Sequence, residues 1–321
     1  MNMIIKETKT PNLLNLIRNN EQFFCKRFFY SKEIPQSVII NELIEKLKKR
    51  DDEKILQLGL FDANGKIHGG VSIYISDWDT QHFGIKVGKT EFLYFDEFVE
   101  LNHRLKFLRE IYKKLFNLKF KVVFLRHPLS DSRTIIALSK VGWFLTDILL
   151  TFHRKLENSL SLEFKRDLQI RVREAHKEDS NSISNLARKS FSISHFHSDP
   201  NFPHTLSSEL YAKWSISSLS EPFSKIFIAE DKDRICGFIM CSVKSLMNKV
   251  SYGVIDLIAV DQDKQRMGIG KLLLTEALKW FLSKVNSVFV GTQAANIPAV
   301  RLYETFGFKL VDSEATFHIW I

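Results

Sequence analysis

The sequence has few cysteines, and none of them is arranged as a metal site would require. Cys25, Cys236 and Cys241 are the only three, an odd number without the close pairs that zinc sites use. Small secreted domains depend on several disulfides, which three cysteines cannot supply. The composition therefore excludes a disulfide scaffold and predicts a protein of a reducing compartment, which we expect to be the cytoplasm.

Long apolar runs and low-complexity segments are also missing. No stretch is apolar for long enough to cross a bilayer, and the first residues, MNMIIKETKTPNLLNLIRNN, lack the uninterrupted apolar core of a signal peptide. The chain has 321 residues, of which 45% are hydrophobic and 26% charged. Such a composition is typical of a globular protein with one large or two ordinary domains, and we expect no membrane span.

Acidic residues are outnumbered by basic ones. The chain has 46 Lys and Arg against 37 Asp and Glu, a net charge of +9 and a pI near 9.3. This balance favours acidic partners, among them nucleic acids and phosphorylated small molecules. The longest basic run, KLKKR at 46–50, follows a helical pattern that also carries Glu42, Glu45 and Asp51. It is typical of a solvated helix face, and we expect no nucleic-acid binding.

Two parts of the chain resemble each other at a constant offset of 165 positions. Val123–Lys155 overlays Val288–Trp320 without a gap, and both parts contain a glycine followed by an aromatic residue and end near an identical Thr-Phe-His. Each reads as strand, turn, short helix and strand, which predicts a structural duplication. We expect a domain boundary within Lys155–Gln169, with an N-terminal domain over 1–157 and a second domain over 168–321.

The segment DQDKQRMGIGKLLLTEAL, at 261–278, predicts an anion site. A β pattern precedes it at 252–260, and a helical pattern follows its two glycines, Gly268 and Gly270. Glycines let backbone amides approach a ligand closely, and a helix start offers unpaired amides and a positive dipole end. The spacing fits neither a P-loop nor the dinucleotide-binding pattern. Arg266 and Lys271 would add positive charge.

The two ordered motifs of the C-terminal half resemble those of the GNAT acetyltransferases. Gln265-x-x-Gly268-x-Gly270 after a strand is similar to their pyrophosphate loop, and the segment from Asn296 to Phe308 is similar to their closing pattern N-x-x-A-x-x-L-Y-E-x-x-G-F. The resemblance covers Ile170–Ile321. It implies an α/β (α+β) fold of tandem GNAT-like domains, each a mixed, mostly antiparallel twisted sheet flanked by helices. The N-terminal copy lacks the glycine turn and would be degenerate.

The resemblance also implies a site for acetyl-CoA as co-substrate. The pyrophosphate would bind the turn, the thioester carbonyl would accept bonds from strand amides, and Asn296 would bond to the CoA arm or simply cap a helix. The residues concerned are Leu257, Ile258, Val260, Gln265, Arg266, Met267, Gly268, Ile269, Gly270, Lys271 and Asn296.

Direct attack of an amine on a thioester requires a proton acceptor and a proton donor rather than a nucleophilic side chain. The resemblance makes Tyr303 the donor to the leaving thiolate, although a packing role for its ring is the alternative; the counterpart of Tyr303 in the first half is Leu138. Asp256 is a candidate base because an unpaired carboxylate in an apolar strand is costly. The alternation of side chains along a strand leaves open whether it points to solvent.

The loop SHFHSDP, at 194–200, resembles the S-R-F-H-x-D-P loop of the family of nucleotide amino-sugar acetyltransferases typified by dTDP-fucosamine acetyltransferase. His195, Phe196, His197 and Asp199 are then candidate acceptor-binding residues, with His195 in place of the expected arginine. Asp199 before Pro200 is equally typical of a turn. The two histidines have no third ligand nearby, so no metal is expected. Trp78 lies in a segment similar to the first half of proteins of that family, and we expect its side chain to be buried by packing.

The sequence therefore predicts an acetyl-CoA-dependent N-acetyltransferase that acts on the amino group of a nucleotide-linked amino-deoxysugar. Two alternatives stay open: an acetyltransferase for a protein N-terminus or small amine, and a module that binds acyl-CoA without turnover. The final strand, ATFHIWI at 315–321, could pair within the chain or across a homodimer.

Overall fold

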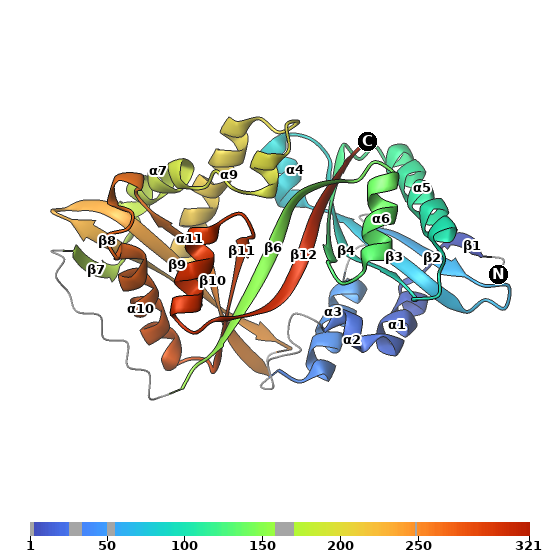
Figure 1. The fold of residues 1–321 in the computed structure, drawn as a ribbon, viewed down its shortest axis with the longest axis horizontal. Coiled ribbons are helices and arrows are strands. Elements are labelled where there is room, and N and C mark those ends of the chain that lie inside the picture. Colours follow the sequence, from blue (N-terminus) through green and yellow to red (C-terminus); the bar gives the residue numbers. More distant parts are fainter. Residues whose placement is uncertain (1–2, 26–33, 50–54, 158–169, 248) are drawn as a thin grey trace. The chain divides into compact units, whose positions relative to one another are not determined.

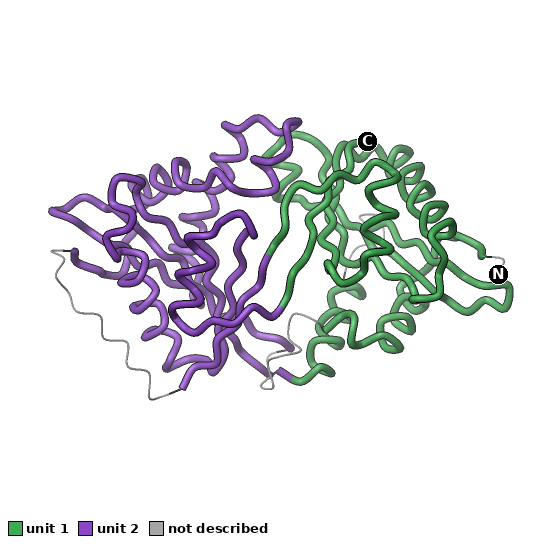
Figure 2. Tube along the Cα trace, viewed as in Figure 1, with its two compact units in different colours: residues 1–29, 35–149, 312–321 green, residues 30–34, 150–311 purple. Residues whose placement is uncertain are grey.

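The chain forms two compact units. The computed structural model describes residues 3–25, 34–49, 55–157, 170–247 and 249–321. Unit 1 contains Met1–Phe29, Pro35–Leu149 and Asp312–Ile321, and unit 2 contains Tyr30–Ile34 and Leu150–Val311 (Figure 2). Most of the expected boundary segment, residues 158–169, lies outside the described residues, so the division into 1–157 and 168–321 stays a prediction.

Unit 1 is a mixed sheet with helices against it. The sheet order is β1-β2-β3-β4-β5-β12, with β4 and β5 parallel and the other pairs antiparallel. Its elements up to β6 are shown in Figure 1: β1 Ile4–Glu7, α1 Thr10–Asn19, α2 Glu21–Phe24, α3 Gln36–Lys49, β2 Ile55–Phe61, β3 Ile67–Ile75, α4 Asp77–Phe83, β4 Val87–Phe95, α5 Leu101–Asn117, β5 Val122–Pro128, α6 Ser132–Lys140 and β6 Phe144–Lys155.

Unit 2 repeats this plan. Its sheet order is β6-β11-β10-β9-β8-β7, and β10 with β11 is parallel, as β4 with β5 is in unit 1. The remaining elements of the chain are β7 Ile170–Glu174, α7 Ser180–Ser190, α8 His195–Ser198, α9 His204–Ser217, β8 Ser224–Asp231, β9 Arg234–Leu246, β10 Val250–Val260, α10 Ile269–Leu282, β11 Ser287–Gln293, α11 Ile297–Thr305 and β12 Lys309–Trp320.

The offset of 165 positions holds element by element. Added to the bounds of β5, α6 and β6, it gives the bounds of β11, α11 and β12. The strand pairing follows the same offset, because Gly88 lies opposite Val123 in unit 1 and Gly253 lies opposite Val288 in unit 2. Both helix exits have a left-handed glycine, Gly142 and Gly307. The expected duplication is therefore confirmed.

The last strand pairs within the chain. β12 lies antiparallel to β5, from Glu314 opposite Pro128 to Trp320 opposite Val122. This answers the question that the sequence left open for this strand. Because Asp312–Ile321 belongs to unit 1, the first sheet is completed by the last residues of the sequence.

Each unit has its own apolar core. In unit 1 the core lies between the sheet and α5 and α6, and in unit 2 it lies between the sheet and α10 and α11. Cys25, Cys236 and Cys241 are all buried and unpaired. Within the described ranges, no helix is both long and apolar enough to cross a bilayer.

Two local expectations differ from the structure. The N-terminal region contains the strand β1, which the sequence does not predict because the strand is short and largely exposed and therefore gives little periodic signal. The segment SHFHSDP, expected to be an irregular loop, contains the four-residue helix α8. Ser194 is the N-cap of this helix, and its side chain accepts a hydrogen bond from the amide of His197.

Candidate active site in unit 2

The glycine turn starts α10 in an unusual conformation. Gly268, the N-cap, has φ of +83°, and Arg266, two residues earlier, has φ of +62°. A left-handed residue is easiest for glycine and costly for arginine. Among the described residues, the backbone amides from Arg266 to Gly270 have no backbone acceptor. The turn therefore offers a row of amide donors at the positive end of a helix.

The helix behind the turn is fixed by burial. Leu273, Leu274, Ala277, Leu278 and Phe281 are fully buried in the core of unit 2, at the spacing that the helical pattern predicts. Arg266 and Lys271 are exposed beside the amides, where their charges can reach an anion. The Gln265 side chain donates a hydrogen bond to the Val260 carbonyl at 3.3 Å, which ties the turn to the end of β10.

The strands β10 and β11 separate next to this turn. Their parallel pairing covers only Gly253–Ile255 against Val288–Val290, although β10 continues to Val260 and β11 to Gln293. Figure 1 shows β10 and β11 side by side behind α11. The two strands therefore part beyond Ile255, and Leu257, Ile258 and Val260 lie on the end of β10 that pairs with β9 but not with β11.

A β-bulge marks the point where the strands part. On β9, Cys241 lies opposite Ile255 and Met240 lies opposite Leu257, so Asp256 has no partner of its own. A bulge shifts the phase of side chains along a strand and often re-aims a residue beside an active site. Here Ile255 and Ile258 belong to the α10 side of the sheet, whereas Asp256 lines a pocket.

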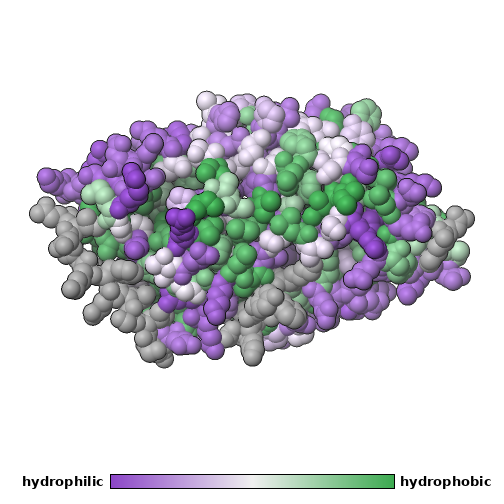
Figure 3. Space-filling view, in the orientation of Figure 1, coloured by the Kyte–Doolittle hydropathy of each residue, from purple (hydrophilic) through white to green (hydrophobic). Residues whose placement is uncertain are grey.

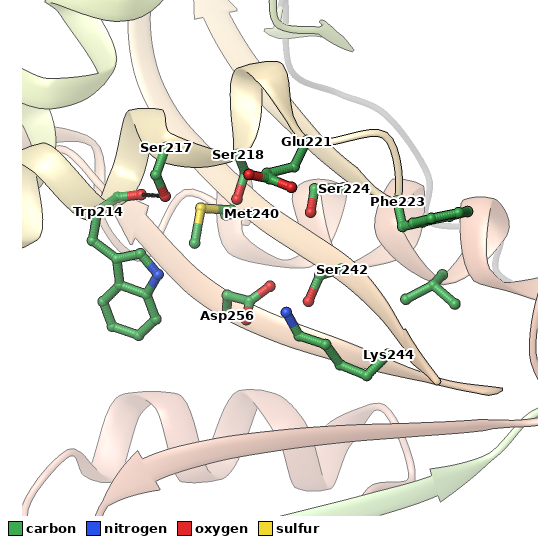
Figure 4. Close-up of a pocket in the computed structure, with 11 residues that line it drawn as sticks. Trp214, Ser217, Ser218, Glu221, Phe223, Ser224, Met240, Ser242, Lys244 and Asp256 are labelled. Atoms are coloured by element: carbon green, nitrogen blue, oxygen red, sulfur yellow. Dashed lines mark hydrogen bonds between the residues drawn. The ribbon is translucent and has the colours of Figure 1, made fainter. Parts of the chain in front are cut away.

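That pocket, which we call the Asp256 pocket, has a volume of about 260 Å³. It is lined by residues of α9, β8, β9, β10 and the turn between α9 and β8, shown in Figure 4: Trp214, Ser217, Ser218, Glu221, Phe223, Ser224, Met240, Ser242, Val243, Lys244 and Asp256. All of them belong to unit 2.

Asp256 is in an environment that favours its protonated form. Burial raises the pKa of its carboxyl group above the usual range, while the Ser242 hydroxyl and the Lys244 charge act more weakly in the opposite direction. Its Oδ2 atom is buried and has no hydrogen-bond partner among the described residues. A carboxylate with a raised pKa is better suited to accept a proton near neutral pH. Asp256 therefore does not point outward to bulk solvent.

Tyr303 lies on the other side of β9 and β10. It is only 2% exposed, and its ring packs between Phe152 and Phe308, with centroids 6.1 and 5.9 Å away. Burial, with a smaller contribution from Cys241, raises the pKa of its phenol, so the group stays protonated at neutral pH. No hydrogen bond joins its hydroxyl to another described residue. Asp256 and Tyr303 both interact electrostatically with Cys241.

Asn296 is the N-cap of α11. Its Oδ1 atom accepts a hydrogen bond from the Ala299 amide at 3.3 Å, so the capping role considered from the sequence is present. The side-chain amide group remains available as a donor. Two large apolar side chains, Met267 at 42% and Ile297 at 51% exposure, lie at the starts of α10 and α11. Figure 3 shows hydrophobic residues reaching the surface on this face between hydrophilic patches.

The four loop residues are built into a compact local structure. His197 contacts Ser194 Oγ through Nδ1 at 2.8 Å and Ser208 Oγ through Nε2 at 3.3 Å. Asp199 is 1% exposed and accepts bonds from the Asn201 amide and side chain. His195 and Phe196 are buried, with ring centroids 3.9 Å apart. These contacts explain how the side chains of this loop are held in place. An acceptor-binding role for them stays a prediction.

The glycine turn, β10 and α11 thus bring most of the expected site residues into one part of unit 2. Sequence reasoning missed the bulge and most of the Asp256 pocket, notably Trp214, Glu221 and Lys244 as lining residues. No motif signals these three residues, because they come from three separate segments: α9, the turn before β8, and β9. No group of three or more possible metal ligands occurs in the described part of the chain.

The equivalent place in unit 1 is built differently. At an offset of 165, the positions of Gly268 and Gly270 are His103 and Leu105, and that of Asn296 is Asp131. Arg104, only 1% exposed, donates hydrogen bonds to Asp131 at 3.1 Å and to the backbone carbonyls of Val99 and Asp96. A buried guanidinium and its carboxylate partner therefore stand where unit 2 has glycines and an asparagine.

Comparisons with known proteins agree with this arrangement. Residues 181–308 match the model of the acetyltransferase (GNAT) family. The spore coat polysaccharide biosynthesis protein SpsD of Bacillus subtilis (strain 168) is 27% identical over 143 residues, 44% of this chain and 48% of SpsD. The chain thus spans about half the length of SpsD. An N-alpha-acetyltransferase of Sulfurisphaera tokodaii is 27% identical over 158 residues, 46% of this chain and 86% of the relative.

A solved structure covers both units. The tandem GNAT protein from the clavulanic acid biosynthesis pathway is 11% identical, with a TM-score of 0.61 over 99% of this chain and 98% of that chain. At this identity the likeness shows the fold alone. It confirms the expected fold class: tandem GNAT-like units, each a mixed sheet flanked by helices. The likeness to acetyltransferases rests on residues 181–308 of unit 2, which match the GNAT family model.

Proposed function

We propose that the protein transfers an acetyl group from acetyl-CoA to the amino group of a nucleotide-linked amino-deoxysugar. The observation that carries the proposal is the row of amides from Arg266 to Gly270, without acceptors among the described residues, beside the separation of β10 from β11. An anion binds such a row, and an extended chain can follow the unpaired strand edge.

The residues of this region suit acetyl-CoA. The amides of Arg266–Gly270 would hold its pyrophosphate, assisted by the exposed Arg266 and Lys271 side chains. Met267 and Ile297 would cover the pantetheine arm with exposed apolar surface, and Asn296 would donate a bond to it. When bound, acetyl-CoA supplies an activated thioester. The Leu257 and Ile258 amides, past the bulge, point to opposite edges of β10, and the one that faces away from β9 would donate to the carbonyl oxygen as charge develops there.

The two titratable groups divide the proton transfers. Asp256 accepts a proton from the acceptor ammonium, directly or through water, so that a neutral amine attacks the carbonyl carbon. Tyr303 gives its proton to the departing thiolate. The raised pKa values of both groups suit these roles, since a base must hold a proton readily and an acid must be protonated beforehand.

The acceptor assignment has two supports. SpsD carries a name from polysaccharide biosynthesis, and the net charge of +9 favours two polyanionic substrates over a polycation. The three cysteines, buried and unpaired, are consistent with action in the cytoplasm, where nucleotide-linked sugars would be encountered.

A second candidate is acetylation of a peptide N-terminus. Two archaeal relatives, 27% and 29% identical over part of the chain, are named N-alpha-acetyltransferases. A third reading, binding of acyl-CoA without turnover, is disfavoured by Tyr303 and Asp256, because neither buried polar group would be needed for binding alone.

The direct test is release of CoA thiol from acetyl-CoA, followed with a chromogenic thiol reagent. The acceptor panel contains dTDP- and UDP-linked 3-amino and 4-amino deoxysugars, short peptides with free N-termini, and spermidine. We expect turnover with one class of nucleotide-linked amino sugar. Turnover with peptides alone would replace the acceptor assignment with the second candidate, and CoA binding without turnover on any amine would favour the non-catalytic reading.

A further inference from the structure

The Asp256 pocket has the size and lining of a site for one polar ring. Its volume of about 260 Å³ lies near the lower limit of small-molecule sites, about 300 Å³, so a whole nucleotide sugar does not fit inside it. Trp214 provides a flat apolar surface, and Ser217, Ser218 and Ser224 provide hydroxyl groups. Aromatic faces and hydroxyl groups together suit a polyhydroxylated ring.

Two buried polar atoms in the pocket point to a ligand. Ser242 is 2% exposed, and neither its Oγ atom nor Asp256 Oδ2 makes a hydrogen bond of good geometry with a described residue, although the Ser242 hydroxyl lies close enough to lower the pKa of Asp256. Leaving buried polar groups unpaired is costly. Both residues line the pocket, so a bound polar molecule would satisfy atoms that the protein itself leaves unsatisfied.

Lys244 gives the pocket a cation that forms no ion pair with a described residue, although its charge acts on Asp256 at longer range. No carboxylate in the described residues lies within the 4.0 Å ion-pair limit of its Nζ, whereas Lys264 of the same unit pairs with Asp231 at 2.7 Å. Lys244 follows Ser242 by two residues on β9, so both side chains point to the same side of the sheet. Figure 4 shows Trp214 and Lys244 on opposite sides of Asp256.

We propose that Lys244 binds a phosphate group of the acceptor, while the amine-bearing ring enters the Asp256 pocket against Trp214. Lys244 would then select amines carried by phosphorylated rings, with the nucleotide outside the pocket. This inference rests on the proposed function and refines it. A peptide N-terminus has no anionic group at a fixed position beside its amine, so a dedicated cation would bring it no benefit.

The test compares two acceptors that differ only in the anionic part: dTDP-linked 4-amino-4,6-dideoxyglucose and the methyl glycoside of the same amino sugar. We expect Lys244→Met to raise the KM of the dTDP-linked acceptor about tenfold or more, the effect of losing one charge-assisted hydrogen bond. The KM of the methyl glycoside should hardly change. Because the Lys244 charge lowers the pKa of Asp256, any change in kcat should be the same for both acceptors, and Lys244→Arg should restore most of the affinity.

The matched control is Lys249→Met. Lys249 is exposed on the hairpin between β9 and β10 but does not line the pocket, so its removal takes away the same charge without the proposed contact. We expect unchanged KM values. An equal rise in the KM of both acceptors with Lys244→Met would overturn the inference, because it would mean that Lys244 acts only through Asp256. The absence of any effect would overturn it as well.

A binding measurement separates this inference from the proposed function. With CoA saturating, calorimetric titration with dTDP should show tighter binding to the wild type than to Lys244→Met, whether or not any amine is acetylated. Equal affinities would contradict the role of Lys244. Failure of the wild type to acetylate any amine would instead contradict the proposed function. This second result comes from the wild type alone and needs no variant.

Discussion

The Tyr303 hydroxyl is the atom on which the proposed reaction depends most directly. The ring of Tyr303 lies in the core of unit 2, and the hydroxyl makes no hydrogen bond with a described residue, so removal of the hydroxyl should not disturb the fold. We expect Tyr303→Phe to lower kcat by about 10²–10⁴, the range for loss of a general acid, with CoA affinity unchanged. Steady-state kinetics and calorimetry measure the two effects. Full activity of the variant would remove Tyr303 from the mechanism.

Asp256 should make opposite contributions to stability and activity. Because its pKa is raised above 3.8 by burial, the folded state holds this proton more tightly than the unfolded state. Stability therefore falls as pH rises from about 3.8 through the raised pKa. At neutral pH we expect Asp256→Asn to raise the Tm, since it removes a buried charge, and this gain should vanish below about pH 4.

The same variant should lose activity. In the wild type, kcat/KM should fall as pH drops through the raised pKa of Asp256, because only the carboxylate accepts a proton. Asp256→Asn should lower kcat by about 10²–10⁴ and abolish this acidic limb. A pH profile together with thermal melts at several pH values measures both effects. A variant that is less stable at neutral pH, or whose acidic limb persists, would contradict the assignment.

The glycine turn can be tested against another left-handed glycine, Gly142 at the exit of α6 in unit 1. Gly268 and Gly142 both have left-handed φ values, +83° and +92°, so alanine at either should cost about 1–2 kcal/mol of stability. Only Gly268 lies in the proposed pyrophosphate site. We expect Gly268→Ala and Gly142→Ala to lower the Tm similarly, and only the former to weaken CoA binding by about tenfold or more. Equal CoA affinities would exclude the turn as the site.

The sequence predicts much of the fold at the level of these elements. The offset of 165 gives the bounds of β11, α11 and β12 from those of their counterparts, because repeated strands and helices keep their apolar spacing. The glycine motif predicts the start of α10. The bulge at Asp256 escapes prediction, since one extra residue leaves a strand apolar overall, and β1 escapes because only four mostly exposed residues form it.

The pocket could not be predicted for a different reason. Trp214, Glu221 and Lys244 are brought together by the packing of α9 near the sheet and by the pairing of β8 with β9, which are long-range contacts. Local patterns predict helices and strands, but they do not state which face of α9 meets which strand. The exchange of Asp312–Ile321 into unit 1 is equally invisible, since each half of the duplicated sequence ends in the same way.

The two units should differ in CoA binding although they share one plan. Unit 1 has His103 and Leu105 where unit 2 has glycines, and Arg104 bonds to the carbonyls of the loop in front of α5. We expect calorimetric titration of the whole chain with CoA to saturate at one molecule per chain. Gly268→Ala should weaken this single site, and a second site of similar affinity would contradict the degenerate character of unit 1.

The position of β12 in unit 1 has a consequence for biosynthesis. β5 pairs with β4 on one side, but its second neighbour is present only when Glu314–Trp320 is available. The first half of the chain therefore emerges from the ribosome with one edge of its sheet still unpaired. Domains made first usually fold first, but here unit 1 must wait until unit 2 has been synthesised. Ribosome-bound chains halted after Val311 should therefore be more sensitive to protease in their N-terminal half than released ones.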